Sequence, residues 1–301
     1  MAGKASDPWS GYWRGEATGQ AAAASLGETD PAVRAVLDRP WHELAAMLPR
    51  RAALLDLATG GGIVLRTLQS LRKDLRLTGV DAAAELPRLA GAKMAGGVDL
   101  AALPFADNAF DAVTSRFGIE YADVAKAARE AARVLKPGGA LSFVVHHAQS
   151  PIVAHNRARL GALRWAWSES GMLEKARSLA RSRRVAALPT PRQFSEAAAQ
   201  ARGLFPAQPV AWEFLTAITQ TLDMGLGRPE SEVLGVLDTL AERAAGETAR
   251  LEQLQAAACD EGRVAALGEA LRAGGVSMQP HGILSRAGGA HPLAWSLTGT
   301  K

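Results

Sequence analysis

The stretch Leu55-Asp56-Leu57-Ala58-Thr59-Gly60-Gly61-Gly62 decides the fold of this chain of 301 residues. It joins a short apolar run, 52–57, to a segment with helical character, 63–71. Glycine lets the backbone approach a bound group closely, and the first turn of a helix presents free N–H groups. A strand, a glycine turn and a helix in this order predict a site for a nucleotide-like ligand, although three glycines also make a plain turn.

Two carboxylates sharpen this interpretation. Asp56 lies just ahead of the glycine turn, and Asp81 ends the next apolar run, 19 residues after Gly62. A carboxylate at the end of the second strand can accept two hydrogen bonds from a ribose diol. The spacing therefore favours a nucleoside-containing ligand over a plain turn.

Short apolar runs alternate with helical segments along the first half of the chain. This alternation predicts a parallel sheet with helices on both faces, an α/β fold. We expect strands near 52–57, 76–81, 96–99, 110–114 and 140–146, with two more at the C-terminus. Asp30 followed by Pro31 predicts the start of an N-terminal helix, because Asp is a good N-cap and Pro fits the first turn.

The second half of the chain has a different composition. From 151 to 258 the sequence is rich in Ala, Leu, Arg and Glu, is broken by prolines, and predicts four or five helices without a strand. We therefore expect four parts: an N-terminal helical cap (1–50), an α/β core (51–150), a helical lid or substrate insert (151–258), and a C-terminal helix with two strands that complete the sheet (259–301).

Composition excludes several classes of protein. Hydrophobic residues make up 48% of the chain and charged residues 21%, which is typical of a folded soluble domain. The apolar runs are far shorter than the roughly 18–20 residues of a membrane span, and no secretory signal is evident. Cys259 is the only cysteine, so an internal disulfide or a Cys-x-x-Cys site is impossible. We expect a cytoplasmic monomer or homodimer.

Positive charge is concentrated in 151–192. The formal net charge of the chain is +4, but this segment holds nine basic residues against two acidic ones. The basic residues either pair with the acidic stretch 223–269 on a solvated helical face, or attract an anionic substrate, a membrane surface or RNA.

Four segments together resemble class I S-adenosylmethionine-dependent methyltransferases. The stretch 55–62 resembles motif I, with Ala58 at the first glycine position, as in ubiquinone/menaquinone-type methyltransferases, and 79–81 resembles motif II. The segment 99–111, Asp-Leu-Ala-Ala-Leu-Pro-Phe-Ala-Asp-Asn-Ala-Phe-Asp, and the segment 132–139, Ala-Arg-Val-Leu-Lys-Pro-Gly-Gly, are similar to two further motifs of this family.

The resemblance implies a Rossmann-like seven-stranded sheet, with the last strand antiparallel, and S-adenosylmethionine as cofactor. It implies that the backbone of Ala58, Thr59, Gly60, Gly61 and Gly62 lines the methionine and ribose, just after Asp56. Asp81 would hold the ribose hydroxyls, Asp99 and Leu100 would face adenine, and Ser115 and Arg116 would lie near the sulfonium. Only 18 residues separate Asp81 from Asp99, so any helix between them must be short.

The acceptor side is less defined. The loop 115–121 is not an Asn-Pro-Pro-Tyr or Asp-Pro-Pro-Tyr loop, has no cysteine nearby, and has no carboxylate at 115–116. These features argue against amino methylation of nucleobases, cytosine C5 chemistry and a magnesium site, and we expect no metal. His146 and His147 end the fifth strand, at the ligand edge of such sheets, where a neutral imidazole can accept a proton.

We favour His147 as the general base, with His146 in reserve; either could instead bond a neighbouring loop. Glu120 and Tyr121 are further catalytic candidates, although a solvated carboxylate and a packed phenol need no function. Aromatic side chains gather in the N-terminal segment 9–13 and in the insert. They either hold helices together or close over the cofactor and form an apolar wall around the acceptor.

These observations predict a metal-independent methyltransferase that acts on a small molecule, hydrophobic or aromatic, with oxygen favoured as the acceptor atom. Two alternatives remain. One is a methyltransferase that docks RNA or protein on 151–192, although nucleic acid is the less favoured partner. The other is a non-catalytic S-adenosylmethionine-binding protein that acts through its helical insert.

Overall fold

A computed structural model describes residues 8–17, 30–183, 185–286, 288–289 and 291–301. The chain divides into two compact units. The first, here called the sheet unit, comprises the residues up to Ala154 together with Gln253–Lys301, and the second, the helical unit, comprises His155–Glu252. The unit boundaries thus lie at 154/155 and 252/253, where the sequence places them at 150/151 and 258/259.

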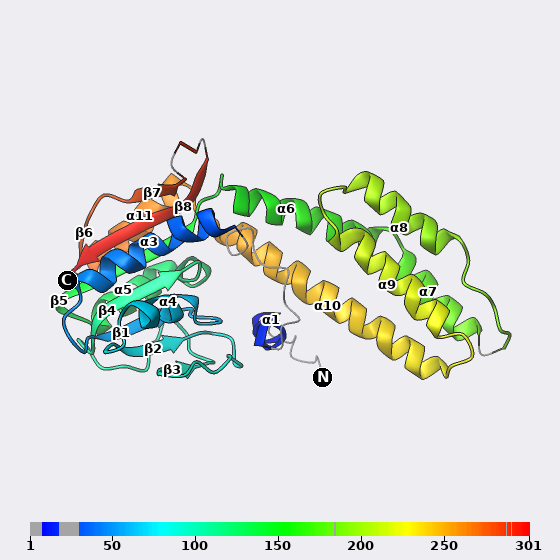
Figure 1. The fold of residues 1–301 in the computed structure, drawn as a ribbon, viewed down its shortest axis with the longest axis horizontal. Helices are drawn as coiled ribbons and strands as arrows, with labels where there is room; N and C mark the ends of the chain where they lie inside the picture. The colour runs from blue at the N-terminus through cyan, green and yellow to red at the C-terminus, as the bar shows by residue number, and fades with distance from the viewer. Residues whose placement is uncertain (1–7, 18–29, 184, 287, 290) are drawn as a thin grey trace. The chain divides into compact units, whose positions relative to one another are not determined.

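The sheet unit is built on the predicted parallel sheet (Figure 1). Its strands follow the order β3-β2-β1-β4-β5-β8-β6, and β7 also pairs with β8. The parallel strands are β1 (Ala53–Leu57), β2 (Arg76–Val80), β3 (Ala92–Ala95), β4 (Phe110–Arg116) and β5 (Leu135–His146). The prediction of an antiparallel last strand is confirmed, since β8 (Pro292–Thr300) runs antiparallel to β5.

The sheet departs from the prediction in two places. It has eight strands instead of seven, because the segment expected as one strand at 276–285 forms β6 (Ser277–Met278) and β7 (Gly282–Ser285), both beside β8. The third strand is 92–95 and not 96–99. Gly97 has φ +72° and donates a hydrogen bond from its N–H to the carbonyl of Ala83, so the chain turns where the strand was expected. The connection 81–91 contains no helix.

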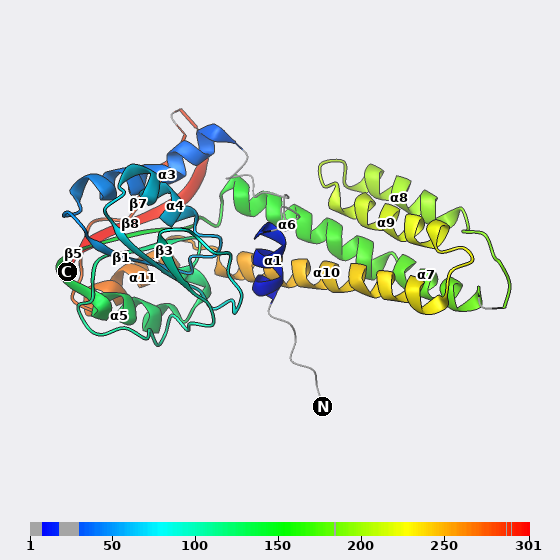
Figure 2. The same ribbon diagram turned by 60° about the horizontal axis from the view of Figure 1, so that its bottom comes forward.

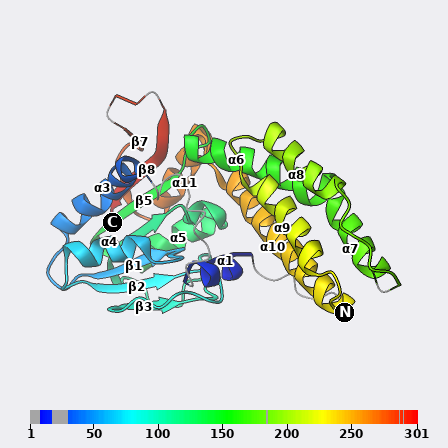
Figure 3. The same cartoon turned by 45° about the vertical axis from the view of Figure 1, so that its right-hand side comes forward.

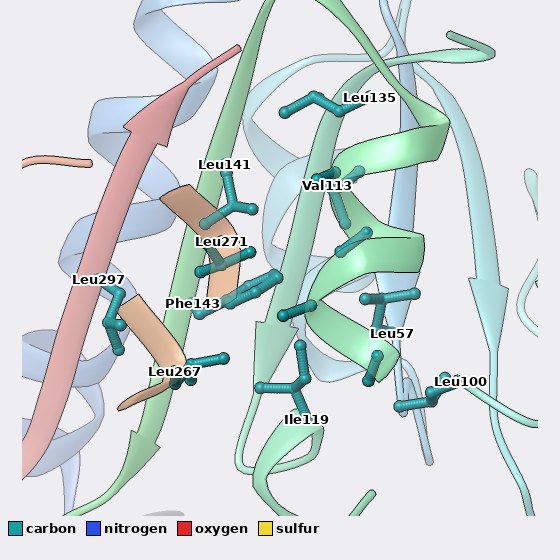
Figure 4. Packing of buried hydrophobic residues seen from close by; sticks show 14 of the residues in the cluster. Leu57, Leu100, Val113, Ile119, Leu135, Leu141, Phe143, Leu267, Leu271 and Leu297 are labelled. Atoms are coloured by element: carbon teal, nitrogen blue, oxygen red, sulfur yellow. The ribbon is translucent and has the colours of Figure 1, made fainter. Parts of the chain in front are cut away.

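Helices cover both faces of the sheet and bury its apolar side chains. On one face lie α3 (Pro31–Met47) and α4 (Ile63–Leu71), which pack Trp41 and Leu65 against the strands. On the other face lie α5 (Val124–Val134) and α11 (Glu261–Ala273), with Phe143 at the centre of the core (Figure 4). The predicted start of α3 is confirmed: the Asp30 side chain accepts hydrogen bonds from the N–H groups of Ala32 and Val33.

The helical unit has its own apolar core, formed largely by residues of α7, α8, α9 and α10. Its elements are α6 (Pro151–Arg164), a π-helical turn (Trp165–Glu169), α7 (Met172–Ser182), α8 (Gln193–Leu204), α9 (Val210–Met224) and α10 (Glu230–Ala257). Figures 2 and 3 show the long α10 from two further sides. The helices α6 and α10 each begin or end in the sheet unit. No helix in the described residues has an apolar stretch long enough to span a membrane.

Three basic residues of 151–192 form ion pairs with the acidic stretch inside the helical unit, as one of the two interpretations predicted. Ion pairs join Arg159 to Glu247 at 2.5 Å, Arg164 to Glu252 at 2.5 Å, and Arg177 to Asp238 at 2.6 Å. Each acidic partner lies in the stretch 223–269. These pairs hold α6 and α7 against α10, so this part of the positive charge has a structural role.

Candidate cofactor and acceptor site

The glycine turn lies between β1 and α4 and is built from backbone atoms. The N–H of Thr59 donates to the carbonyl of Val80 at 2.9 Å, which ties the turn to β2. Gly60 and Gly62 have φ of +47° and +77°, values that favour glycine. Gly62 begins α4, and no side chain caps this helix, so its first N–H groups face outward from the turn as donors for a ligand.

Asp81 holds the turn from the neighbouring strand. One carboxylate oxygen accepts from the N–H of Gly60 at 2.8 Å, and the other accepts from the N–H of Ala83 at 2.9 Å. A carboxylate at the end of this strand has the chemistry to accept hydrogen bonds from a ligand's hydroxyls. Nearby, Asp99 is exposed and accepts from the N–H of Ala101, whereas Leu100 is buried.

Asp56 lies beneath the turn and is buried, with 2% of its surface exposed. The hydroxyl of Thr114 on β4 donates to its carboxylate at 2.8 Å. Burial raises the pKa of Asp56 to about 7, because the charged form loses its hydration, and the hydrogen bond from Thr114 only partly offsets this. Asp56 can therefore hold a proton near neutral pH.

Ser115 and Arg116, which the resemblance places near the sulfonium, are both engaged within the protein. The buried hydroxyl of Ser115 donates to the carbonyl of Leu57 at 3.0 Å and accepts from the N–H of Ile119 at 3.0 Å. Arg116 forms a 3.0 Å ion pair with Asp38 on α3, and its side chain is only 3% exposed. These contacts fix the end of β4 and the loop that follows it.

The aromatic residues of α1 (Pro8–Ala17) lie over the turn. A Cβ atom at Gly60 would overlap the ring of Trp13, so this contact requires glycine. Trp9 stacks near Trp13, with 6.2 Å between ring centroids, and meets the edge of Tyr121 at 5.6 Å. The N-terminal aromatic residues thus connect the glycine turn to the loop after β4.

Glu120 and His146 form a buried pair on the acceptor side. One oxygen of Glu120 accepts from the backbone N–H of His146 at 2.9 Å and lies 2.8 Å from its Nδ1. In the tautomer that lets an ionised carboxylate accept from this ring, Nδ1 carries the proton and Nε2 carries the lone pair. The second oxygen of Glu120 is buried with no hydrogen-bond partner within the part of the chain that the structure describes. Phe117 stacks on the imidazole at 4.1 Å.

His147 follows the last residue of β5 and has different neighbours from His146. Its ring stacks on Trp295 with 4.4 Å between centroids, and its Nδ1 accepts from the N–H of Gln149 at 3.1 Å. Burial lowers the pKa of His147. The structure therefore brings together three of the four catalytic candidates, Glu120, Tyr121 and His146, and sets His147 in a separate environment.

Sequence analysis missed three residues that shape this site: Asp38, Phe117 and Trp295. Asp38 is one of several charged residues on a surface helix, and no pattern marks it as the partner of Arg116. Phe117 has φ +54°, an uncommon value for an aromatic residue that sequence alone does not reveal. Among the described residues, no group of three or more His, Cys, Asp and Glu side chains could hold a metal ion.

Comparison with known proteins places this arrangement in a family. Residues 55–143 match a family described as a methyltransferase domain. The chain contains a class I methyltransferase domain. Its matched region begins at the strand before the glycine turn and ends in β5, so it includes Asp56, Asp81 and Glu120.

The methyltransferase domain is similar to two enzymes of quinone biosynthesis. It is 40% identical over 116 residues to the demethylmenaquinone methyltransferase of Thermus thermophilus, a match that covers 35% of this chain and 53% of the relative. It is 33% identical over 118 residues to the ubiquinone/menaquinone biosynthesis C-methyltransferase of Geotalea daltonii, covering 34% and 50%. The chain thus spans about half the length of these curated relatives.

A solved S-adenosylmethionine-dependent methyltransferase from Mesorhizobium loti is 27% identical, over 37% of this chain and 56% of that one, with a TM-score of 0.31. S-adenosylmethionine is the cofactor of this class of domain. The residues present fit it, since the uncapped start of α4 can bind a carboxylate and Asp81 has the chemistry to accept from a diol.

Proposed function

We propose that this protein transfers a methyl group from S-adenosylmethionine to a hydroxylated small molecule, hydrophobic or aromatic, with the hydroxyl oxygen as acceptor. The observation that carries the proposal is the Glu120–His146 pair, because it supplies a base beside a loop joined by stacked aromatic rings to the glycine turn. A methyltransferase domain with these two features has the parts needed for proton removal and for cofactor binding.

The cofactor half of the site, formed by the glycine turn and Asp81, would bind its ligand mainly through backbone atoms. The backbone of Ala58, Gly60 and Gly62 and the start of α4 would receive the methionine and ribose, and Asp81 would orient the diol. Leu100, which is buried, would flank adenine beside Asp99. S-adenosylmethionine, when bound, supplies a methyl group on a positively charged sulfur, which is already activated for transfer.

The acceptor half of the site, formed by Glu120, His146 and the rings around them, would remove the proton from the acceptor hydroxyl. Glu120 fixes the Nδ1–H tautomer of His146, so Nε2 is ready to accept a proton from an acceptor hydroxyl. The negative carboxylate also stabilises the imidazolium that results. The sequence favoured His147 over His146 as the base. The surroundings of the two rings support the reverse order, because only His146 is oriented by a carboxylate.

The surroundings of His146 favour an aromatic acceptor. Phe117 stacks on the imidazole, and Tyr121 lies edge-on to it at 5.9 Å. Trp9 extends this group of rings on the other side of Tyr121. Aromatic walls with one polar group at their centre are typical of sites that bind flat, apolar ligands.

Two alternatives are less well supported: a methyltransferase that docks RNA or protein, and a non-catalytic cofactor-binding protein. Three of the arginines that could dock RNA or protein, Arg159, Arg164 and Arg177, are instead paired with Glu247, Glu252 and Asp238 inside the helical unit. A purely structural role for Glu120 leaves its second oxygen buried without a donor in the described residues, which costs free energy unless a ligand or water binds there. This favours an acceptor site over a non-catalytic cofactor-binding protein.

A second candidate function is methylation of a ring carbon. The name of the Geotalea daltonii relative specifies a C-methyltransferase. Removal of a phenolic proton increases the electron density on the adjacent ring carbons as well as on oxygen, so the same base would serve either acceptor atom. The two functions differ only in which nucleophilic atom lies nearest the methyl group.

Incubation with S-adenosylmethionine carrying a ¹³C-labelled methyl group would test the proposal against a panel of phenols, naphthols and reduced quinones. We expect label in product, and its carbon chemical shift distinguishes a methoxy group from a ring methyl. A matched reaction with catechol and added magnesium, with and without chelator, checks that turnover is independent of metal. Cofactor binding without label transfer to any hydroxylated acceptor would contradict the proposed activity.

A further inference from the structure

Two connections lie at the same end of the helical unit. One is 183–192 between α7 and α8, and the other is 225–229 between α9 and α10 (Figures 2 and 3). Arg183 links them: its Nε donates to the carbonyl of Leu188 at 2.8 Å, and its Nη1 donates to the carbonyl of Leu222 at the end of α9. These connections, together with the last residues of α7 and α9, form a single surface, here called the tip.

Large aliphatic side chains protrude from the tip. Val185 is 86% exposed and Met224 is 73% exposed, and Leu226 and Leu188 are 49% and 39% exposed. Many other large apolar residues of the unit, such as Leu215 and Ile218, are buried in its own core, and Leu204 and Val236 are exposed away from the tip. Single exposed apolar residues are common on protein surfaces, but four gathered on one surface are a feature that folding of the unit does not require.

Arginines outnumber acidic residues around these side chains; the acidic residues at the second connection are Asp223, Glu230 and Glu232. The segment 181–192, Arg-Ser-Arg-Arg-Val-Ala-Ala-Leu-Pro-Thr-Pro-Arg, contains four arginines and no acidic residue. Arg181 and Arg192 are exposed, and Arg228 in the second connection has 63% of its side chain exposed beside Glu232. The tip therefore differs from the sides of the unit, where arginines pair with the acids of α10.

We propose that the tip docks on the surface of an anionic lipid bilayer. Aliphatic side chains on short loops can enter the boundary between headgroups and acyl chains, while arginines bind the lipid phosphates. A site for single-stranded nucleic acid would instead need aromatic side chains for base stacking, and the exposed apolar residues of the tip are all aliphatic. The inference goes beyond the proposed methyl transfer and does not depend on it.

Sedimentation of the full chain with vesicles tests this inference. We expect binding to vesicles of equal parts phosphatidylcholine and phosphatidylglycerol, much weaker binding to pure phosphatidylcholine, and a decrease at high salt because screening weakens the arginine contacts. The double substitution Val185→Ser with Met224→Ser should lower the partition coefficient by about tenfold. Arg181→Gln with Arg192→Gln should reduce the preference for the anionic vesicles.

Leu204→Ser with Ile283→Ser is the matched control, since these side chains are 53% and 52% exposed and lie outside the tip. It should bind vesicles like the wild type, and the thermal unfolding midpoint should be unchanged in every variant. The inference is overturned if the wild type does not bind anionic vesicles. It is equally overturned if the control loses as much binding as the variant Val185→Ser with Met224→Ser. It is also overturned if the tip substitutions dissociate a dimer while vesicle binding persists.

Discussion

The cofactor half and the acceptor half of the site are constructed on different principles. Around Gly60 and Asp81 the contacts are mostly backbone atoms held by one carboxylate, so local sequence spacing determines the geometry. Around Glu120 and His146 the contacts are side chains from segments 26 residues apart in sequence, brought together by the pairing of β4 with β5. The first half is therefore marked by a motif, whereas the second depends on which way individual side chains point.

The sharpest test of this contrast is substitution of the two adjacent histidines. His146→Ala should lower turnover by roughly 100- to 10,000-fold, the usual contribution of a general base, because Nε2 is its proton acceptor. His147→Ala should retain turnover within about threefold, since that ring packs on Trp295. Calorimetry should show little change in cofactor affinity in either variant. Equal losses in the two variants would remove the distinction between the rings.

Asp56 offers a test within the cofactor half that needs no substrate. Its pKa is about 7 in the folded protein against 3.8 for a free side chain, so the unfolded state binds fewer protons between these values. Its contribution is fully present below pH 3.8 and is lost as pH rises to about 7, an effect of roughly 2–4 kcal/mol.

Asp56→Asn should abolish that contribution, because the amide carries no charge at any of these pH values and can still accept from Thr114. Urea unfolding at a series of pH values between 4 and 8 would measure it, and the variant should gain stability relative to wild type at the alkaline end. Glu174→Gln, on an exposed side chain, is the control and should leave the profile unchanged. Parallel profiles for wild type and Asp56→Asn would contradict the burial argument.

Asp81 tests whether a carboxylate or the backbone dominates cofactor binding. Asp81→Asn should weaken S-adenosylmethionine binding by about 1.5–3 kcal/mol, the range for a charge-assisted hydrogen bond, as measured by titration calorimetry. Asp99→Asn should have a smaller effect, because that side chain is exposed. An unchanged affinity in Asp81→Asn would mean that the turn binds the cofactor through backbone contacts alone.

The smallest expected effect concerns Ala58, which has φ +50° where the family motif has glycine. An L-residue in this conformation is strained, so Ala58→Gly should raise the free energy of unfolding by about 0.5–1 kcal/mol. Ala53→Gly, at the first residue of β1, should instead lower the free energy of unfolding, because glycine weakens a regular strand. Chemical denaturation of both variants measures the pair, and destabilisation by both would show that the Ala58 side chain contributes more by packing than it costs in strain.

Sequence reasoning succeeded where a local interaction decides the outcome. The cap at Asp30, the strand before the glycine turn and the antiparallel last strand follow from short motifs or from the family resemblance. It failed where tertiary contacts decide. The chain turns at Gly97 because of a hydrogen bond to the carbonyl of Ala83, and this contact exists only after the two segments meet.

The same distinction holds for the candidate site. The positions of Asp56, Asp81 and the glycines could be anticipated because each lies at a strand end of fixed direction. The sequence could not decide which of His146 and His147 is the better candidate base, since both lie at the end of one strand. Only their neighbours distinguish them: Glu120 beside His146 and Trp295 beside His147. Glu120 could be named as a candidate, but its pairing with His146 required the register between β4 and β5.

The late position of β8 has a consequence for the order of folding during synthesis. Seven residues of β5 pair with β8, yet the whole helical unit is synthesised between the two strands. Until the last residues emerge, that edge of β5 lacks its partner and can pair with another chain. The pairs Arg159–Glu247 and Arg164–Glu252 bring the two ends of the helical unit together. Once this unit has folded, the loop that β8 must close is shorter by the length of the unit, which lowers the entropic cost of forming the pairing.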